Sequence, residues 1–321
     1  MKAAVRHKYG IPSDLTIKEI EIPKPKENEV LIRVRATTVN RSDCHELSGR
    51  PLFMHLFTGL VTPRRQVIGS DFAGDVESVG TGVQAFRVGD RIMGFSGGLG
   101  CGCHAQYFTL PEEKAKKIMV TMPSNITYDQ AAACLEGVVY AAQMVRPLNL
   151  QAGQKALVYG ATGAIGIAAL QILKSFGLFV TAVCKGEQAD LVRSLGADKV
   201  VDYTREDFTN DSERYDLVFH AVGKSTFLHC RKLLKEKGVF AAWGGAINLL
   251  WVIVTPLLGG RRVAFPRSFG VATELNYVKS LIEQGKFTPV IDRKYPLEEI
   301  AQAYLYVIKG EKIGNVIITN E

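Results

Sequence analysis

The sequence predicts an α/β protein in which a doubly wound parallel sheet is inserted into a β-rich domain. Three observations lead to this prediction. Residues 1–123 contain short apolar runs separated by turn residues, which is typical of strands. After Pro123, β-rich runs alternate with segments of helical periodicity. At one junction between such a strand and helix, glycine recurs at positions 160, 163 and 166.

Length and composition favour a soluble globular protein with two domains. The chain has 321 residues, of which 47% are hydrophobic and 22% charged, and chains of this length commonly form more than one domain. The formal net charge of +7 is spread along the sequence without a lysine or arginine block. We therefore expect no nucleic acid partner, and a basic surface also suits a phosphorylated cofactor.

Neither export nor a membrane span is predicted. The first residues lack an apolar core of signal-peptide length, and the most apolar run, 247–258, is too short to cross a bilayer. The six cysteines show no disulfide framework. We therefore expect a cytoplasmic protein with no membrane partner.

The strands of the first region are separated by Pro and Gly residues. Pro23 and Pro25, Gly80 and Gly82, and the glycines at 97, 98 and 100 separate them. The expected strands are 15–22, 29–39, 72–79, 91–95 and 105–109.

The second region begins with one helix over 127–145, which Thr127 or Asp129 could cap. Helices are then expected at 164–176, 187–195 and 225–235, with later ones at 274–284 and 297–309. The expected strands are 156–159, 179–184, 199–201, 216–220, 238–242, 262–266 and 316–319.

The glycine turn is a candidate dinucleotide site. It joins the strand 156–159 to the helix after Gly166, and a second β-rich run follows at the distance that a strand-helix-strand unit requires. Gly160 and Gly163 are expected to take backbone angles closed to other residues, and Gly166 to let helix and strand approach. Amides at the helix start would then attract phosphates. The candidate cofactor residues of this turn are Gly160, Thr162, Gly163, Ala164, Ile165 and Gly166.

The whole chain resembles the medium-chain dehydrogenase/reductase superfamily, in its zinc-free quinone oxidoreductase branch. Besides the glycine turn, the resemblance rests on the order of several short motifs: Glu29-Val-Leu-Ile-Arg-Val, Val39-Asn-Arg-Ser-Asp43, Gly69-Ser-Asp71-Phe-Ala-Gly74, Val88-Gly-Asp-Arg91, Leu195-Gly-Ala-Asp198, Asp202-Tyr203 and Gly314-Asn-Val-Ile. It implies a GroES-like catalytic domain over 1–123 and 270–321, and a Rossmann nucleotide-binding domain over 124–269.

The resemblance also implies that no zinc is bound. Where zinc-dependent relatives have a cysteine and a Gly-His-Glu motif, this chain has Asn40 and Gly69-Ser70-Asp71. The third ligand would fall near Cys134 or Leu135, and one thiolate does not hold a zinc ion that needs about three protein ligands. A rival set, Cys44, His45, Cys101, Cys103 and His104, lacks the usual ligand spacing.

Cofactor choice is decided at the end of the second strand of the nucleotide-binding domain. Lys185 follows it, where NAD enzymes place an acid, and could bind the 2′-phosphate of NADPH. Tyr203 resembles a tyrosine that NADPH-dependent relatives use for the same phosphate. Glu187 leaves NADH open. Cofactor contact is also expected at Val222 and Gly223, and with less support at Trp243.

Hydride transfer without a metal requires an electron-poor acceptor, such as a quinone or an α,β-unsaturated carbonyl. Asn40 and Asp43 match substrate-pocket positions of the branch, although Asp43 could equally bind backbone amides. His45 is a weak candidate proton donor, and a surface histidine is the better supported interpretation. Two alternatives remain open, namely a non-catalytic NADPH-binding sensor or structural protein, and an NAD(P)-dependent alcohol or aldehyde dehydrogenase.

The apolar run 247–258 also bears on assembly. A helix with almost no polar stripe must be covered on nearly all sides, either by its own domain or by a second subunit. Relatives commonly pair through the edge of the nucleotide-binding sheet, which the strand 262–266 could provide. We therefore expect a homodimer, with a small-molecule substrate as the other partner.

Overall fold

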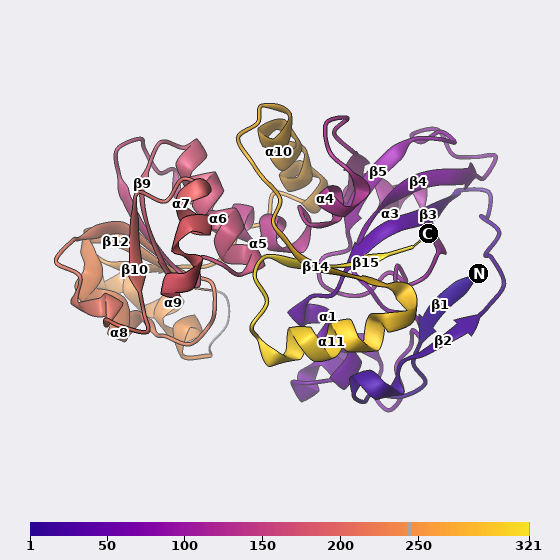
Figure 1. The fold of residues 1–321 in the computed structure, drawn as a ribbon, viewed down its shortest axis with the longest axis horizontal. Coiled ribbons are helices and arrows are strands. Elements are labelled where there is room, and N and C mark those ends of the chain that lie inside the picture. Colours follow the sequence, from indigo (N-terminus) through magenta and orange to yellow (C-terminus); the bar gives the residue numbers. More distant parts are fainter. Residues whose placement is uncertain (243–245, 321) are drawn as a thin grey trace. The chain divides into compact units, whose positions relative to one another are not determined.

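The computed structural model describes residues 1–242 and 246–320, except for the side chains of three residues at 246, 247 and 249. The chain divides into two units (Figure 1). Unit 1 comprises Met1–Glu136, Gly270–Glu283 and Pro289–Glu321, and unit 2 comprises Gly137–Phe269 and Gln284–Thr288. Each unit is described separately.

Unit 1 is built around a sheet with the strand order β14-β15-β3-β4-β5-β7, and β6 pairs with β3 off this path. The pairs are antiparallel except β14 with β15. A separate hairpin joins β1 to β2. The strands of unit 1 are β1 (Lys2–Val5), β2 (Thr16–Glu19), β3 (Glu29–Thr38), β4 (Asp71–Val79), β5 (Arg91–Phe95), β6 (Tyr107–Pro111), β7 (Met119–Thr121), β14 (Ile291–Pro296) and β15 (Asn315–Thr319).

The long strand β3 organises this sheet because its Val30, Ile32 and Val34 side chains share one buried cluster with Phe72 and Ile92 of the neighbouring strands. On β15 and α11, a second buried cluster contains Val316, Tyr304 and Val307. The helices of unit 1 are α1 (Arg41–Ser48), α2 (His55–Thr58), α3 (Glu112–Ile118), α4 (Tyr128–Ala132), α10 (Val271–Glu283) and α11 (Ile300–Lys309).

The expected helix over 127–145 is wrong, because two helices occupy this segment. Thr127 caps α4, its hydroxyl accepting the Gln130 N–H at 3.3 Å. The chain then breaks before α5 (Glu136–Val145). Asn315 Nδ2 holds the break by donating to the Ala133 carbonyl at 3.0 Å. Because α4 packs on β3 and β4, unit 1 continues to Glu136, beyond the expected boundary at residue 123.

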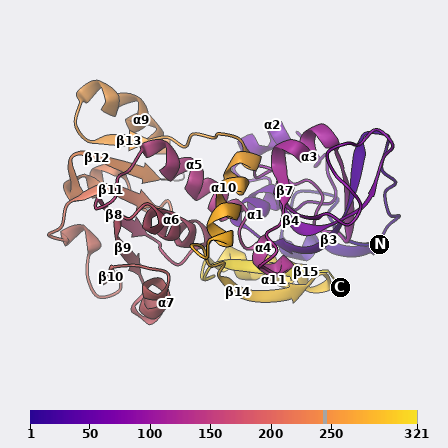
Figure 2. The ribbon, with the colours of Figure 1, turned by 90° about the horizontal axis from the view of Figure 1, so that it is seen from above.

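Unit 2 contains a parallel sheet with the order β10-β9-β8-β11-β12-β13. This order confirms the doubly wound Rossmann fold. Figure 2 shows α9 beside β13 at one edge of the sheet and α7 beside β10 at the other. Its strands and helices are β8 (Lys155–Tyr159), α6 (Ala164–Ser175), β9 (Phe179–Cys184), α7 (Ala189–Ser194), β10 (Lys199–Asp202), β11 (Tyr215–His220), α8 (Phe227–Cys230), β12 (Leu234–Ala242), α9 (Ala246–Leu258) and β13 (Arg262–Ala264).

The helix expected over 225–235 is much shorter than predicted. Thr226 caps α8, a 3₁₀ turn follows at Arg231–Leu233, and β12 then begins at Leu234 instead of residue 238. Leu233 and Leu234 are both fully buried in the core of unit 2, so tertiary packing overrides the helical pattern here. Within the described residues, no helix is long and apolar enough to cross a membrane.

Candidate functional site

The predicted glycine turn lies at the point where the strand order of unit 2 reverses. Strand β8 lies between β9 and β11. Because β8 and β11 are parallel, the loops that follow them meet at the carboxyl end of the sheet. The Ala221 N–H, in the loop after β11, donates to the Tyr159 carbonyl at the end of β8 at 3.0 Å. Ligands of open α/β sheets bind at this position.

Two of the three glycines are required by the local geometry. Gly160 has a φ of +77°, and a Cβ there would lie 2.0 Å from Val222 Cγ2. At Gly166 a Cβ would lie 2.1 Å from the Gly160 carbonyl oxygen, so this glycine lets α6 approach the turn. The expectation of an unusual backbone angle at Gly163 is wrong, because its φ is −77°. A Cβ there would meet nothing closer than 3.7 Å.

The N-terminus of α6 is suited to an anion. Gly163 is the N-cap and provides no side chain to accept the amides of the first turn, which belong to Ala164, Ile165 and Gly166. Free amides and the helix dipole together favour a phosphate at this position. The open space at Gly163 would let a phosphate approach the main chain. The turn is held from the side by Thr162, whose hydroxyl donates to Gln188 Oε1 at 3.0 Å.

Gly137 supports the same helix start and was missed by the sequence analysis. A Cβ at this position would lie 2.8 Å from the carbonyl carbon of Ala164 and 2.9 Å from its Cβ. The first turn of α5 therefore packs directly against the first turn of α6. A glycine inside a helical pattern was the available signal for this close approach.

Lys185 and Tyr203 directly follow the adjacent parallel strands β9 and β10, so both lie at the carboxyl end of the sheet. Cys184, the last residue of β9, is in register with Asp202 of β10, and the Tyr203 N–H donates to the Cys184 carbonyl at 3.2 Å. Both side chains are partly exposed. The Lys185 ammonium lies 3.9 Å from Glu187 Oε1, a weak surface pair that a phosphate could replace.

The part that an acidic residue, Asp202, plays at this end of the sheet was also missed by the sequence analysis. Asp202 accepts hydrogen bonds from Thr204 N at 2.9 Å and Thr204 Oγ1 at 2.7 Å, which hold the pKa of its carboxyl below the usual range. A Cβ on Gly186 would lie 2.4 Å from Asp202 Oδ2. The carboxylate therefore lies against the loop that follows β9, although its strand is the next one along the sheet.

The loop after β11 contains the other expected cofactor residues. Val222 is 45% exposed and covers Gly160, and Gly223 has a φ of +69°. The Gly223 N–H donates to His220 Nδ1 at 3.1 Å. His220 is fully buried and stacks on Tyr159 with ring centroids 4.7 Å apart. Burial lowers its pKa to about 4, so this histidine is neutral. Trp243 lies outside the described residues.

In unit 1, Asn40 and Asp43 are buried in a hydrogen-bond network. The Asp43 carboxylate accepts the Asn40 N–H at 2.8 Å and the Ser70 hydroxyl at 3.2 Å. Asn40 Nδ2 donates to Asp71 Oδ2 at 2.8 Å, and the Thr38 hydroxyl donates to the same oxygen at 2.6 Å. Asp43 thus makes the backbone contact that the sequence analysis left open as an alternative to a chemical role.

Three buried carboxyl groups meet in this network. Asp43, Asp71 and Glu136 are each at most 7% exposed, and Glu136 N donates to Asp71 Oδ2 at 3.4 Å. Burial is the main cause that raises the pKa of Asp71 to about 6 and of Glu136 to about 8. Burial followed by the Glu136 and Asp71 charges raises the pKa of Asp43 well above its usual range. The cluster therefore retains protons near neutral pH.

The residues of the rival metal set do not form one cluster, and the candidate proton donor is exposed. His45 is on the exposed side of α1. Cys44 belongs to one buried cluster, and Cys101 and Cys103 belong to another. Both ring nitrogens of His104 are used, since Nε2 lies 2.9 Å from the Thr38 carbonyl and Nδ1 3.2 Å from the Tyr304 hydroxyl. No group of three or more potential metal ligands is found among the described residues.

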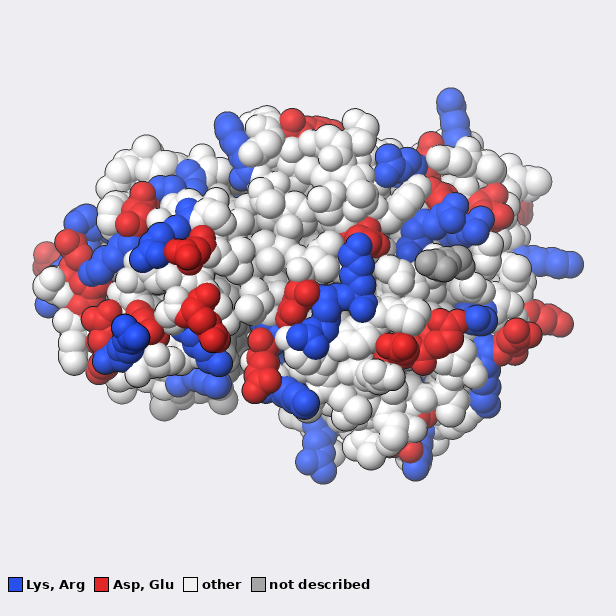
Figure 3. Space-filling view, viewed as in Figure 1, with Lys and Arg blue, Asp and Glu red and all other residues white. Residues whose placement is uncertain are grey.

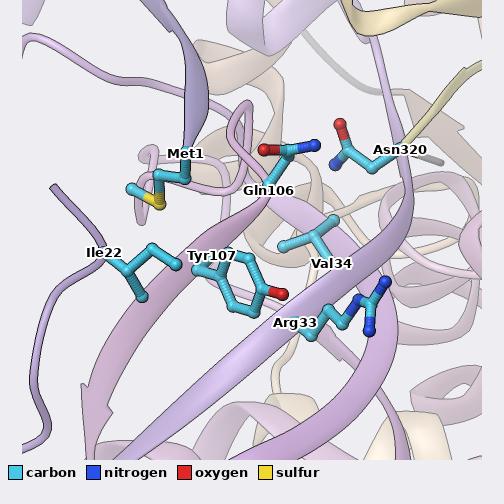
Figure 4. A pocket seen from close by; sticks show the side chains of 7 residues that line it. All are labelled: Met1, Ile22, Arg33, Val34, Gln106, Tyr107 and Asn320. Atoms are coloured by element: carbon cyan, nitrogen blue, oxygen red, sulfur yellow. The ribbon is translucent and has the colours of Figure 1, made fainter. Parts of the chain in front are cut away.

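A further pocket of unit 1, with a volume of about 260 Å³, contains none of the expected site residues. Figure 4 shows Gln106 and Asn320 along one rim and Met1 and Ile22 along another. The remaining lining residues are Arg33, Val34 and Tyr107.

Comparison with known proteins establishes the family. A model of the alcohol dehydrogenase GroES-like domain matches residues 26–122, and a model of a zinc-binding dehydrogenase matches residues 195–318. The NADPH-dependent alkenal/one oxidoreductase of Arabidopsis thaliana chloroplasts is 32% identical over 325 residues, which cover 99% of this chain and 79% of that protein. The chain belongs to the medium-chain dehydrogenase/reductase superfamily. Within it, the chain falls in the quinone oxidoreductase branch.

Two further proteins match this chain over nearly its whole length. A quinone oxidoreductase of Pseudomonas aeruginosa is 28% identical over an alignment that covers 97% of this chain and 97% of that protein. The solved structure of the quinone oxidoreductase from Coxiella burnetii has a TM-score of 0.85 at 23% identity and matches 100% of this chain and 99% of that one. This structural likeness shows the fold.

Proposed function

We propose that this chain is an NADPH-dependent, zinc-independent reductase that transfers a hydride to a quinone or an α,β-unsaturated carbonyl. The observation that carries the proposal is the candidate phosphate site at the N-terminus of α6 in unit 2. Gly163 leaves open space at a helix start without a side-chain cap, and Gly160 and Gly166 allow the close packing of the turn and the helix at the point where the strand order reverses. The printed names of the relatives, which include alkenal/one and quinone oxidoreductases, support the same assignment.

In this proposal the first turn of α6 binds the pyrophosphate of the cofactor, and Val222 and Gly223 contact it from the neighbouring loop. The cofactor itself supplies the hydride. The protein residues bind and orient it. Lys185 and Tyr203 contact the 2′-phosphate, and their adjacent positions on two strands support a preference for NADPH over NADH.

Zinc independence rests on what replaces the expected ligands. The Asn40 side chain donates to the Asp71 carboxyl group, and the Ser70 hydroxyl donates to the Asp43 carboxyl group. A side-chain amide and a hydroxyl are poor zinc ligands compared with thiolate and imidazole. We therefore assign the network a structural role beneath the substrate site, and we leave His45 as a proton donor to be tested by a His45→Gln variant.

The deciding experiment is NADPH oxidation by the purified chain with a panel of quinones and α,β-unsaturated carbonyls. We expect turnover with at least one class and weaker activity with NADH. Tight NADPH binding without turnover on any acceptor would instead indicate a non-catalytic sensor. Activity restricted to simple alcohols and aldehydes would indicate a dehydrogenase of the other kind.

We also propose a homodimer formed through the β13 edge of unit 2, in the cytoplasm. Helix α9 is covered by its own unit on one side only, where Trp251 packs on Phe227 with ring centroids 5.5 Å apart. On its other side, Leu250, Ile253 and Leu257 are 58–84% exposed. An apolar face beside an unpaired sheet edge supports association with a second copy.

Light scattering tests the dimer. We expect a mass twice the 35.2 kDa of one chain, which an Ile253→Glu and Leu257→Glu variant reduces to one chain. Leu305→Glu, at an exposed apolar position on α11 of unit 1, is the matched control and should leave the mass unchanged. A concentration-independent mass of one chain for the wild-type protein would exclude the dimer.

A further inference from the structure

A short segment of unit 1 exposes an unusual number of large apolar side chains. It consists of a 3₁₀ turn (Leu52–Met54), α2 (His55–Thr58) and the residues up to 61. Monomeric proteins rarely expose contiguous apolar surface of this kind without a partner. The side chains concerned are 59–87% exposed and belong to Leu52, Phe53, Leu56, Phe57, Leu60 and Val61.

The fold does not depend on these apolar side chains. The segment is held instead by His55, whose ring stacks on Tyr9 at 4.2 Å, and by the Tyr9 hydroxyl, which donates to the Gly59 carbonyl at 2.6 Å. The Thr58 hydroxyl donates to Met54 O at 2.9 Å, and Arg64 N donates to Thr58 O at 2.8 Å. Polar and backbone contacts therefore fix the segment while its apolar side chains project outward.

The exposed charged residues that flank the segment in sequence have one sign. Arg50 precedes it, Arg64 and Arg65 follow it, and all three are exposed. None of them forms an ion pair within the described part of the chain. The carboxyl groups nearest in sequence, Asp43 and Glu46, are buried, and Glu46 pairs with Arg6. Figure 3 shows that acidic and basic side chains are interleaved over the face of the molecule that it presents.

We propose that residues 50–65 bind peripherally to an anionic lipid bilayer. The phenylalanine and leucine side chains enter the boundary between headgroups and acyl chains, and the three arginines pair with lipid phosphates. No span is involved, since the helix in this segment has four residues. This proposal differs from the expectation from the sequence that a membrane is not a partner.

Charge selects a bilayer over a second copy of the chain. A two-fold contact through this segment would bring six unpaired arginine side chains together, and like charges facing each other across an interface are unfavourable. An anionic lipid surface meets the apolar and the cationic parts of the segment at once. If the proposed function holds, the acceptor class is a lipophilic quinone or carbonyl dissolved in the bilayer, but lipid binding itself does not depend on that function.

The test is co-sedimentation of the full chain with vesicles of phosphatidylcholine alone and of phosphatidylcholine mixed with phosphatidylglycerol. We expect sedimentation with the mixed vesicles that decreases as salt is added. A Phe53→Ser and Phe57→Ser variant should weaken it at least about tenfold. An Arg64→Gln and Arg65→Gln variant should show a preference for mixed over phosphatidylcholine vesicles that is about tenfold smaller than that of the wild type.

The matched control is Leu305→Ser with Ile308→Ser, two exposed apolar positions on α11 of the same unit. It should sediment as the wild type does, and circular dichroism confirms that each variant is folded. Absence of sedimentation with anionic vesicles, or equal sedimentation of the Phe53→Ser and Phe57→Ser variant, overturns the proposal. A KM for a water-soluble acceptor that rises in that variant without any vesicle binding would assign the segment to the substrate site instead. Loss of NADPH oxidation with normal vesicle binding would contradict only the proposed function.

Discussion

Replacing Glu136 by Gln should make unit 1 less sensitive to rising pH. Burial is the main cause that raises the pKa of Glu136 to about 8, from an ordinary value of 4.5. The folded chain therefore holds this proton more tightly than the unfolded chain does. The resulting stability is fully present below the ordinary pKa and is lost as the pH rises toward the folded-state pKa. A neutral amide of the same shape undergoes no such loss.

The size of the effect follows from proton linkage. Between about pH 5.5 and 7.5 the unfolded chain has released the proton while the folded chain still binds it, so one proton contributes about 1.4 kcal/mol per pH unit. Over this interval the wild type should lose about 3 kcal/mol of stability relative to Glu136→Gln. The Glu136 charge also helps to raise the pKa of Asp43, so the comparison measures the loss of the Glu136 titration together with this coupling.

The assay must report on unit 1. Both tryptophans, Trp243 and Trp251, belong to unit 2, so intrinsic tryptophan fluorescence is unsuitable. Hydrogen exchange of a peptide covering β4 measures the relevant free energy of opening. Glu77→Gln, at an exposed position of the same strand, is the control and should follow the wild type. Identical pH dependence of wild type and Glu136→Gln would refute the assigned protonation of Glu136.

Three further outcomes are expected. Lys185→Ala should weaken NADPH binding by about 1–3 kcal/mol and spare NADH, and equal losses measured by titration calorimetry would contradict the assigned 2′-phosphate contact. Gly160→Ala should lower the melting temperature of unit 2 because of its positive φ and the Val222 contact, whereas Gly163→Ala should leave melting unchanged but weaken NADPH binding; equal effects on melting would refute this distinction. Elemental analysis should find no stoichiometric zinc, and activity should survive a chelator, so one tightly bound zinc per chain would overturn the assignment based on Asn40 and Ser70.

Local patterns predicted the parts of the fold that local forces determine. The strands of unit 2 and the turn at Gly160 were found because apolar runs and glycine spacing are readable in short windows. Helix α1, which follows Asn40, was not foreseen. The break before Glu136 was also missed, since it depends on Asn315, which is remote in sequence but reaches the Ala133 carbonyl.

The buried carboxyl cluster could not be predicted for the same reason. Asp43, Asp71 and Glu136 are separated by tens of residues and come together only in the folded unit 1, where the Asn40 amide groups donate to Asp43 and Asp71 and the Glu136 N–H donates to Asp71. Asp43 was therefore recognised as a candidate residue without its partners. The exposure of Phe53 and Phe57 is a similar case, because an apolar sequence does not show which of its residues the fold leaves uncovered.

The position of β15 has a consequence for how the chain is synthesised. This strand lies inside the sheet of unit 1, between β14 and β3, yet it consists of residues Asn315–Thr319. Until β15 has been synthesised, the Ala36–Thr38 part of one β3 edge has no partner, although β6 pairs with Glu29–Arg33 of β3. The contiguous stretch Gly137–Phe269 of unit 2 is by then already available to fold. The N-terminal portion must therefore wait for the C-terminal portion with an open strand edge, which is a hazard for aggregation. Loss of β15 would leave this part of β3 permanently open.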